Sequence, residues 1–206
     1  MSELKTDEEK AEELKAWWRE NGNSIIVGVA LAIAALFGWE YWKEHKLETA
    51  EAAATLYSES QDAADKTQAD QVLQRLQNEY SATPYATMAA LQTAKNHAEA
   101  GEYQQAADRL QWVLDNTAEA EYQDVANLRL ARVLIAMEQP EKALAITEKT
   151  FASAYEPLLE ELRGDIYAAQ NKIDEARKAY ERAILTNQGG STEFIQMKLD
   201  NLAKGA

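Results

Sequence analysis

One uncharged apolar stretch constrains this chain more than any other feature of its sequence. Residues 21–39 read NGNSIIVGVALAIAALFGW and hold no charged side chain, with Glu20 and Glu40 at the two ends. A helix rises about 1.5 Å per residue, so this stretch spans roughly 28 Å, close to the hydrocarbon thickness of a bilayer. The sequence therefore predicts one transmembrane helix over residues 22–42. The apolar side chains expected in the bilayer are Ile25, Ile26, Val27, Val29, Leu31, Ile33, Leu36, Phe37 and Trp39.

Aromatic side chains flank the apolar stretch on both sides. Trp17 and Trp18 precede it, and Tyr41 and Trp42 follow its last tryptophan. Amphipathic rings are enriched where membrane helices pass through the two membrane–water interfaces. Their placement supports the membrane interpretation.

Three other interpretations fit the stretch less well. A core helix of a globular protein normally carries a polar stripe, and this stretch has none. A cleaved signal peptide has a basic leading region and a small-residue cleavage site. Here the leading tail is mixed and acidic, and the stretch ends in Leu36-Phe37-Gly38-Trp39. A helix in the plane of the interface needs a charged face, which is also absent.

The distribution of lysine and arginine predicts the orientation of this helix. Positive residues concentrate on the cytoplasmic side of membrane helices, and acidic residues count for little in this rule. More of them precede the helix than follow it over a comparable span, so the N-terminus is expected in the cytoplasm and the rest on the outer side. The residues counted are Lys5, Lys10, Lys15 and Arg19 before the helix, and Lys43 and Lys46 after it.

The composition excludes several classes of function. The net charge of −14 argues against nucleic-acid binding, which needs clustered cations to neutralise phosphates. The absence of cysteine excludes disulfides, thiol catalysis and cysteine metal sites. With only 3 prolines and 8 glycines in 206 residues, the composition favours helix throughout.

No motif of a nucleotide-binding, hydrolase or metalloprotease site is present. The two histidines, His45 and His97, are far apart in the sequence. The many carboxylates fit a solvated helix surface, where ion pairs are worth little. We therefore expect no cofactor, no metal site and no catalytic site, and we interpret the chain as a binding protein rather than an enzyme.

The spacing of apolar residues predicts helices on both sides of the membrane segment. A short helix is expected over residues 11–20 of the tail. The membrane helix is expected to continue, directly or after a short break, to about Ala64. Another helix is expected over residues 68–80, and a last helix over residues 192–202 follows a turn at residues 188–191.

From Pro84 onwards the chain repeats. Three units are expected over residues 85–114, 124–151 and 157–185, each with two helices joined by a short turn. Periods in the thirties with helix–turn–helix units are the signature of stacked helical repeats. The sequence therefore predicts an all-α repeat domain.

A small residue recurs at the same place in each unit. Ala106, Ala143 and Ala176 follow the three turns at separations of 37 and 33 residues. Small side chains allow the two helices of a unit to approach closely. We expect Ala131 and Gly164 to be partners on the first helices.

These units resemble tetratricopeptide repeats. The third unit fits best, the first fits well over residues 101–114, and the second is looser. No unit carries the closing proline of that family, and Arg163 stands where leucine is usual, departures that bear on the angle between units. The matching positions of the third unit are Gly164, Tyr167, Ala176, Tyr180 and Ala183.

Six segments along the chain carry a second, narrower resemblance. These are Glu20-Asn21-Gly22, the membrane helix, Gly38-Trp39-Glu40-Tyr41-Trp42, Asn127-Leu128-Arg129-Leu130-Ala131-Arg132, Leu162-Arg163-Gly164 and Gln196-Met197-Lys198-Leu199-Asp200-Asn201-Leu202. On these segments the chain resembles, over nearly its full length, the family of YfgM, ancillary subunits of the bacterial SecYEG translocon.

Members of that family are inner-membrane proteins with a periplasmic repeat domain. They associate with the translocon and with PpiD, a membrane-anchored periplasmic chaperone of the prolyl-isomerase class. The resemblance implies these partners, together with exported client proteins, for this chain. It also implies a cytoplasmic tail over residues 1–21, a transmembrane helix over residues 22–42 and a periplasmic repeat domain over residues 43–206.

Stacked helix pairs present a concave surface lined by the first helix of each unit. Helical phase predicts a groove of mixed apolar and charged side chains, suited to an extended or helical peptide segment. The residues expected to line it are Met88, Leu91, Lys95, Val125, Leu128, Arg132, Ile135, Leu158, Glu161 and Asp165.

The favoured hypothesis is a single-pass scaffold that contacts translocon and chaperone partners and assists the handover and folding of exported proteins. An assembly or regulatory adaptor for another envelope complex is the alternative, because it shares the fold and differs only in partner. A membrane-bound hydrolase fits least well, since no catalytic constellation is present.

Overall fold

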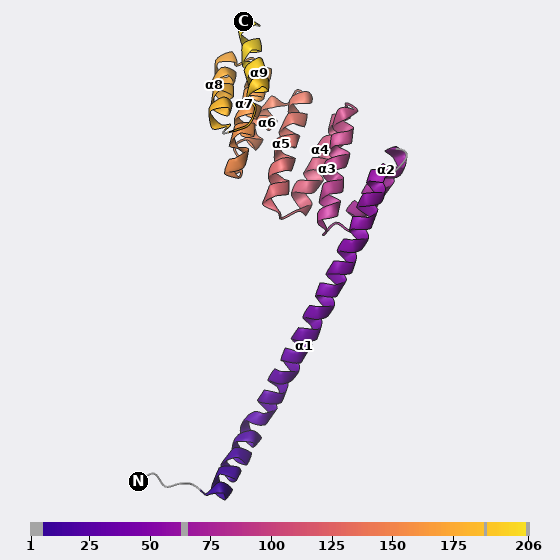
Figure 1. Cartoon of the computed structure of the whole chain (residues 1–206), viewed down its shortest axis with the longest axis vertical. Coiled ribbons are helices and arrows are strands. Elements are labelled where there is room, and N and C mark those ends of the chain that lie inside the picture. The colour runs from indigo at the N-terminus through magenta and orange to yellow at the C-terminus, as the bar shows by residue number, and fades with distance from the viewer. Residues whose placement is uncertain (1–5, 63–65, 188, 205–206) are drawn as a thin grey trace, which may run out of the picture. The chain divides into compact units, whose positions relative to one another are not determined.

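The computed structural model describes residues 6–62, 66–187 and 189–204, and these residues are helical without any strand, which confirms the all-α class. The expected helix end near Ala64 and Gln188 of the expected turn lie outside the described residues. The chain divides into two compact units, Met1–Glu51 and Ala52–Ala206. The elements are α1 (Asp7–Asp62), α2 (Lys66–Glu79), α3 (Pro84–Glu99), α4 (Tyr103–Asn116), α5 (Ala120–Ala136), α6 (Pro140–Ile146), η1 (Ser153–Tyr155), α7 (Glu156–Ala169), α8 (Ile173–Thr186) and α9 (Glu193–Lys204) (Figure 1).

The first helix begins at a reciprocal pair of cap hydrogen bonds. The Glu9 carboxylate accepts from the Thr6 backbone N–H at 3.0 Å, and the Thr6 hydroxyl accepts from the Glu9 N–H at 3.4 Å. This capping box satisfies N–H groups that a helix start leaves open. The short helix expected over residues 11–20 is therefore not separate: α1 runs on from Asp7 through the apolar stretch, because no proline or left-handed residue interrupts it.

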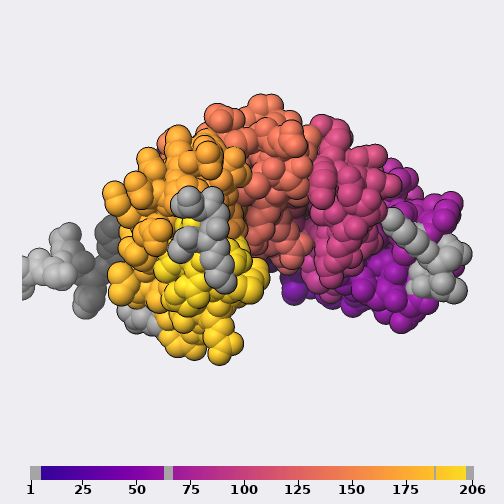
Figure 2. All heavy atoms as spheres, turned by 90° about the horizontal axis from the view of Figure 1, so that it is seen from above, coloured from indigo at the N-terminus to yellow at the C-terminus, as the bar shows by residue number. Residues whose placement is uncertain are grey.

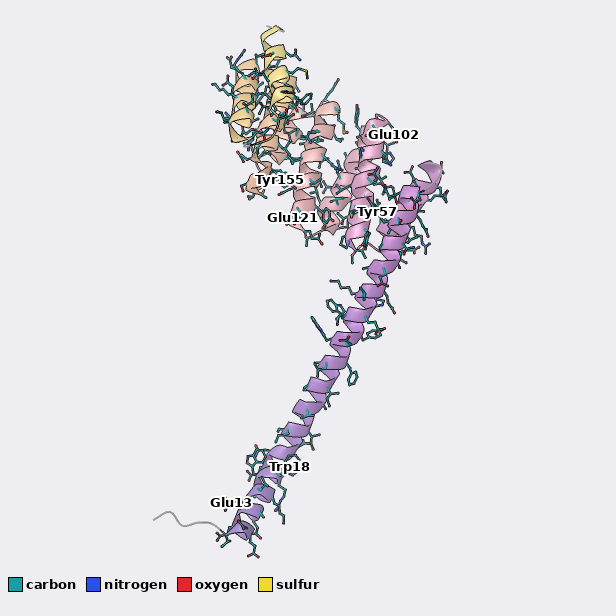
Figure 3. All side chains as sticks on the ribbon, in the orientation of Figure 1. Glu13, Trp18, Tyr57, Glu102, Glu121 and Tyr155 are labelled. Atoms are coloured by element: carbon teal, nitrogen blue, oxygen red, sulfur yellow. The ribbon has the colours of Figure 1, made fainter. Side chains whose placement is uncertain are left out.

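The apolar stretch of α1 is uncovered in the first unit. From Ile26 to Trp39 its large apolar side chains are 49–74% exposed. Side chains project from this part of α1 in every direction (Figure 3). The helix is long and apolar enough to cross a membrane.

In the second unit, paired helices follow one another in chain order. The pairs are α3 with α4, α5 with α6, and α7 with α8, and α9 packs against α8. Figure 2 shows their atoms as a continuous arch, with α9 in yellow at the inner side of one end. The three expected repeat units are therefore present, preceded by α2.

The three turns inside the pairs have one geometry. Gly101, Glu138 and Asn171 have φ angles of 77°, 58° and 60°. In each case the next residue donates its N–H to the carbonyl five residues back at 2.9 Å, as Glu102 does to His97. This is the Schellman motif, in which a left-handed residue satisfies the last carbonyls of a helix. The left-handed residues recur at the same separations as the alanines that follow the turns, so turn and helix contact repeat together.

The small residues lie where the helices meet. Ala106, Ala131, Ala143 and Ala176 are fully buried. Gly164 is buried as well, and its neighbour is the ring of Tyr180 on α8: a Cβ built on Gly164 would lie 2.3 Å from Tyr180 Cε1. A side chain at this crossing would force α7 and α8 apart.

Three apolar clusters stabilise the second unit. The largest extends from Ala90 on α3 to Ile166 on α7. A smaller one joins Ala53 at the end of α1 to α2 and α3, and a third joins Tyr180 and Ile195 across α8 and α9. Each cluster includes helices from outside a single pair, so no pair has a separate core.

The second pair differs most from the repeat pattern. Its second helix, α6, ends at Ile146, five residues before the expected end of the unit. The segment that follows is held to α5 by side chains: Lys149 Nζ donates to Asn127 Oδ1 at 2.9 Å, and the Ala152 N–H donates to Asp124 Oδ2 at 3.1 Å. These contacts take the place of the missing helical turns.

Arg163 has a specific role at the unusual position noted in the sequence. Its guanidinium contacts the buried Glu160 carboxylate and donates to the Thr147 carbonyl at 2.7 Å. Arg182 on α8 donates to the same Glu160 carboxylate at 2.6 Å. Arg163 therefore joins α7 to the end of α6, where leucine would supply only apolar contact.

Replacing Gly164 by alanine tests the close approach of α7 and α8. Alanine normally stabilises a helix interior by about 0.5–1 kcal/mol over glycine. Here the Tyr180 ring blocks the Cβ, so we expect Gly164→Ala to lower the free energy of unfolding by about 1–3 kcal/mol. Urea unfolding followed by circular dichroism measures the change. In a Tyr180→Leu background the same substitution should cost little, and an equal loss there would refute the steric explanation.

Candidate interaction surface

The structure places half of the predicted groove residues in or beside the core. Leu91 and Leu128 are 8% and 3% exposed and belong to the largest apolar cluster. Val125 and Ile135 pack against that cluster and are partly buried, and Met88 is partly buried as well. These side chains therefore lie beneath the predicted groove and form little of its exposed surface.

Two acidic residues predicted for the groove are covered by the last helix. Lys198 on α9 lies 2.8 Å from Glu161 Oε1 and 2.7 Å from both carboxylate oxygens of Asp165. Its ammonium also lies 4.8 Å from the centre of the Phe194 ring. Leu158, one turn before Glu161 on α7, is 41% exposed.

Tyr180 completes this cluster at the junction of α7, α8 and α9. Its hydroxyl donates to Asp165 Oδ1 at 2.8 Å. Burial, followed by the hydrogen bond to Asp165, raises the pKa of Tyr180 well above its usual value. The phenol therefore remains a hydrogen-bond donor, and Asp165 accepts from both Tyr180 and Lys198. This network fastens α9 to the last repeat pair.

The other two charged residues of the predicted groove, Lys95 and Arg132, line one pocket of about 280 Å³. Arg129 lines it too and donates to the Leu91 carbonyl at 3.2 Å. The Lys95 ammonium lies 3.7 Å from Glu99 in an exposed pair. Within the described residues, Arg132 has no ion-pair or hydrogen-bond partner. The apolar residues of the lining are Ala94, Ala98, Leu110 and Val133.

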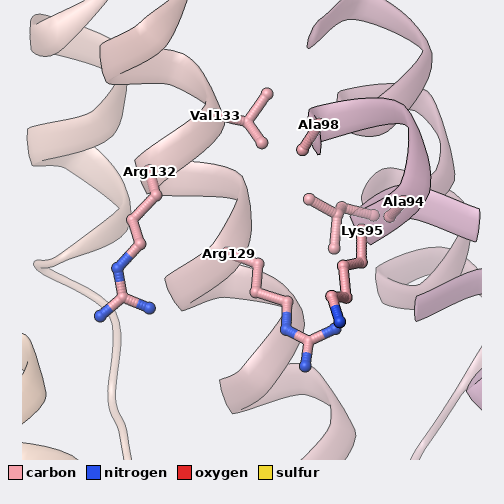
Figure 4. Close-up of a pocket in the computed structure, with 7 residues that line it drawn as sticks. Ala94, Lys95, Ala98, Arg129, Arg132 and Val133 are labelled. Carbon is pink, nitrogen blue, oxygen red and sulfur yellow. The ribbon is translucent and has the colours of Figure 1, made fainter. Parts of the chain in front are cut away.

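Figure 4 shows how the cations are arranged around this pocket. Lys95 from α3 and Arg129 from α5 converge at one edge, and the guanidinium of Arg132, also on α5, lies apart from both. Ala98 and Val133 face each other across the opening. The arrangement suits a ligand that is apolar at its centre and anionic at two points.

Sequence reasoning missed Arg129 and Lys198. Arg129 precedes Arg132 by three residues, so the two share a helix face and helical phase could have identified it. Lys198 gave no such signal, because its contacts depend on how α9 folds back over α7. Among the described residues, no three His, Asp or Glu side chains are grouped closely enough to hold a metal ion.

The repeated helix pairs of the second unit and the exposed apolar helix of the first define the class: a helical-repeat protein with an N-terminal helix apolar enough to cross a membrane. The sequence pattern of the tetratricopeptide repeat-like domain family matches residues 15–204. No solved structure matches the chain.

Curated relatives narrow the class. The chain is 29% identical to the ancillary SecYEG translocon subunit of Escherichia coli K12, over 98% of this chain and 100% of the relative. It is 30% identical to the subunit of the same name from Aggregatibacter actinomycetemcomitans, over 95% of this chain and 97% of the relative. The Neisseria gonorrhoeae subunit is 29% identical over the same shares. The chain belongs to this family of ancillary SecYEG translocon subunits with a tetratricopeptide repeat-like domain.

Replacing Lys198 tests the network that fastens α9. Lys198→Gln leaves two partly buried carboxylates without their cation, so we expect the local stability of α9 to fall by about 1–3 kcal/mol. Hydrogen exchange of the α9 amides measures this loss. Lys198→Arg should restore most of the protection, and Lys178→Gln, an exposed residue on α8, should leave it unchanged. Unaltered exchange in Lys198→Gln would show that apolar packing alone holds α9.

Proposed function

We propose that this chain is a membrane-anchored adaptor that associates with the SecYEG translocon. The observation that carries the proposal is the joining of an uncovered apolar helix to a repeat unit, in a chain similar over its whole length to curated translocon subunits. An adaptor needs a tether and a polypeptide-binding surface, and the chain has a candidate for each.

The apolar stretch of α1 is the proposed anchor. The large apolar side chains from Ile26 to Trp39 are about half exposed or more, and burial in lipid stabilises each of them by about 1.5–3 kcal/mol. The bias of lysine and arginine toward the leading tail supports a cytoplasmic N-terminus. We therefore propose a cytoplasmic tail over residues 1–21, an inner-membrane helix over residues 22–42 and a periplasmic repeat domain over residues 43–206.

The repeat unit is the proposed binding module. A tether confines the unit to the membrane surface beside its partners, so contacts that are weak individually reach useful occupancy. The proposed partners are the translocon, a PpiD-like periplasmic chaperone and exported proteins in transit. Handover of these clients requires weak and reversible contacts, which a surface pocket supplies more readily than a buried site.

The predicted groove residues divide between two roles in this proposal. Lys95 and Arg132 are proposed to contact partners directly. Leu158, an exposed apolar residue of α7, is proposed to add an apolar contact. Glu161 and Asp165 are proposed to act by holding α9 in place. The buried members of the set are proposed to keep the surface in shape, namely Met88, Leu91, Val125, Leu128 and Ile135.

A single charge in the apolar stretch tests the anchor. An aspartate near the centre of a membrane helix costs about 2.5–3.5 kcal/mol. We expect Ile33→Asp to raise the fraction of the protein in the supernatant after alkaline extraction of membranes without releasing all of it, because one aspartate offsets only part of the apolar stabilisation, whereas the unaltered chain sediments. Leu47→Asp is the matched control, because Leu47 is a similarly exposed apolar residue of α1 beyond the stretch. Recovery of the unaltered chain itself in the supernatant would exclude a membrane role for residues 22–42.

Crosslinking in native membranes tests the partners. The tagged full-length chain is crosslinked with formaldehyde, purified and analysed by mass spectrometry. We expect translocon subunits and a periplasmic chaperone to be enriched over an unrelated single-pass bait of the same orientation. Enrichment of a different envelope complex instead would identify the chain as an adaptor outside secretion and reject the translocon proposal.

A further inference from the structure

The pocket enclosed by α3, α4 and α5 has an apolar floor of limited size. Among the apolar residues that line it, Leu110, Ala94 and Val133 are 1%, 2% and 6% exposed. Its volume of about 280 Å³ is just below the range of about 300–1,000 Å³ that small-molecule sites occupy. The space is large enough to take one apolar side chain.

The charges around the pocket oppose the charge of the whole chain. The net charge is −14, yet each charged side chain that lines the pocket is a cation. Arg129 is oriented by its bond to the Leu91 carbonyl. The exposed contact between Lys95 and Glu99 is worth little, so Lys95 can exchange it for another carboxylate at small cost.

The cations provide two separate positions, each of which can bind an anionic group. Lys95 and Arg129 converge at one edge of the pocket, and Arg132 stands apart from them (Figure 4). Guanidinium groups bind carboxylates through paired N–H donors, and such charge-assisted bonds are about twice as strong as neutral ones. A ligand that matches all three features carries an apolar group between two carboxylates.

We propose that this pocket binds an acidic segment of another polypeptide, in which one apolar side chain enters the cavity. A carboxylate on one side of that residue contacts Lys95 and Arg129, and a carboxylate on the other side contacts Arg132. The inference rests on the proposed adaptor function and specifies the chemistry of the partner segment. A short acidic segment is favoured over a long polyanion, because a short segment contacts only the local cations, whereas a long one also meets the negative charge of the rest of the surface.

The test uses the full-length chain in detergent micelles and a synthetic probe. A fluorescein-labelled peptide with the core sequence EDLDE between Gly–Ser ends is titrated, and fluorescence anisotropy reports binding. Two control peptides replace one feature each: QNLNQ removes the charges and EDSDE removes the apolar side chain. We expect EDLDE to bind more tightly than both, with an affinity that falls as salt concentration rises.

Matched variants locate the binding on the chain. Lys95→Gln combined with Arg132→Gln is expected to weaken EDLDE binding by about tenfold or more, since two charge-assisted contacts are lost. Lys142→Gln combined with Lys178→Gln removes the same charge from exposed sites elsewhere and is expected to change affinity by no more than about twofold. Ala98→Leu fills the cavity and is expected to reduce binding while leaving all cations in place.

Several results would overturn the proposal. The first is a failure of EDLDE to bind at about 1 mM, a concentration that detects even weak affinity. The second is equal affinity for EDLDE and QNLNQ. The third is equal affinity for EDLDE in the Lys95/Arg132 variant and in its control. Displacement of the peptide by a short-chain anionic phospholipid would reassign the pocket to lipid. If peptide binding fails while translocon subunits still crosslink to the chain, the pocket inference is wrong and the adaptor function stands. If translocon subunits do not crosslink to the chain while EDLDE still binds, the adaptor function is wrong and the pocket still binds acidic polypeptide.

Discussion

Large apolar side chains along α1 are exposed in the part of the chain that the structure describes, and this exposure is the constraint on which the account depends. Residues 26–39 expose eight such side chains, each worth about 1.5–3 kcal/mol when removed from water. Such a helix is stable only where another apolar phase surrounds it, and the proposed bilayer is that phase. The repeat unit, whose apolar side chains are mostly buried in its own clusters, is then free to serve as a binding module.

Close contact between paired helices gives the repeat unit its form. Alanine or glycine occupies the crossings, and Gly164 admits the ring of Tyr180 at a distance that no Cβ would allow. The turns repeat one left-handed backbone conformation, at Gly101, Glu138 and Asn171, and each reverses the chain between the two helices of a pair. At the C-terminal end, Lys198 fastens α9 over the last pair. The α9 helix thereby covers the end of the stack, where a further repeat would otherwise pack.

Most of the fold could be predicted from the sequence, because a period of 33 to 37 residues and buried alanines such as Ala106 and Ala143 are local signals. The site was harder to predict. Leu91 and Leu128 share a helix face with Lys95 and Arg132, yet the first pair is buried and the second exposed. A rotation of a fraction of a turn decides between these outcomes, and it is set by packing against neighbouring pairs. Contacts made by α9, such as Lys198 with Asp165, depend on tertiary folding alone.

Cysteine labelling in spheroplasts tests the central claim most directly, since the chain has no cysteine of its own. Lys15→Cys, Ile33→Cys and Lys178→Cys each introduce one thiol, in the tail, the apolar stretch and the repeat unit. With a membrane-impermeant maleimide outside the cells, we expect only Lys178→Cys to react, and Lys15→Cys to react after the membrane is permeabilised. Reaction of Ile33→Cys at the rate of Lys178→Cys would show that the apolar stretch lies in water and would contradict a membrane-spanning α1.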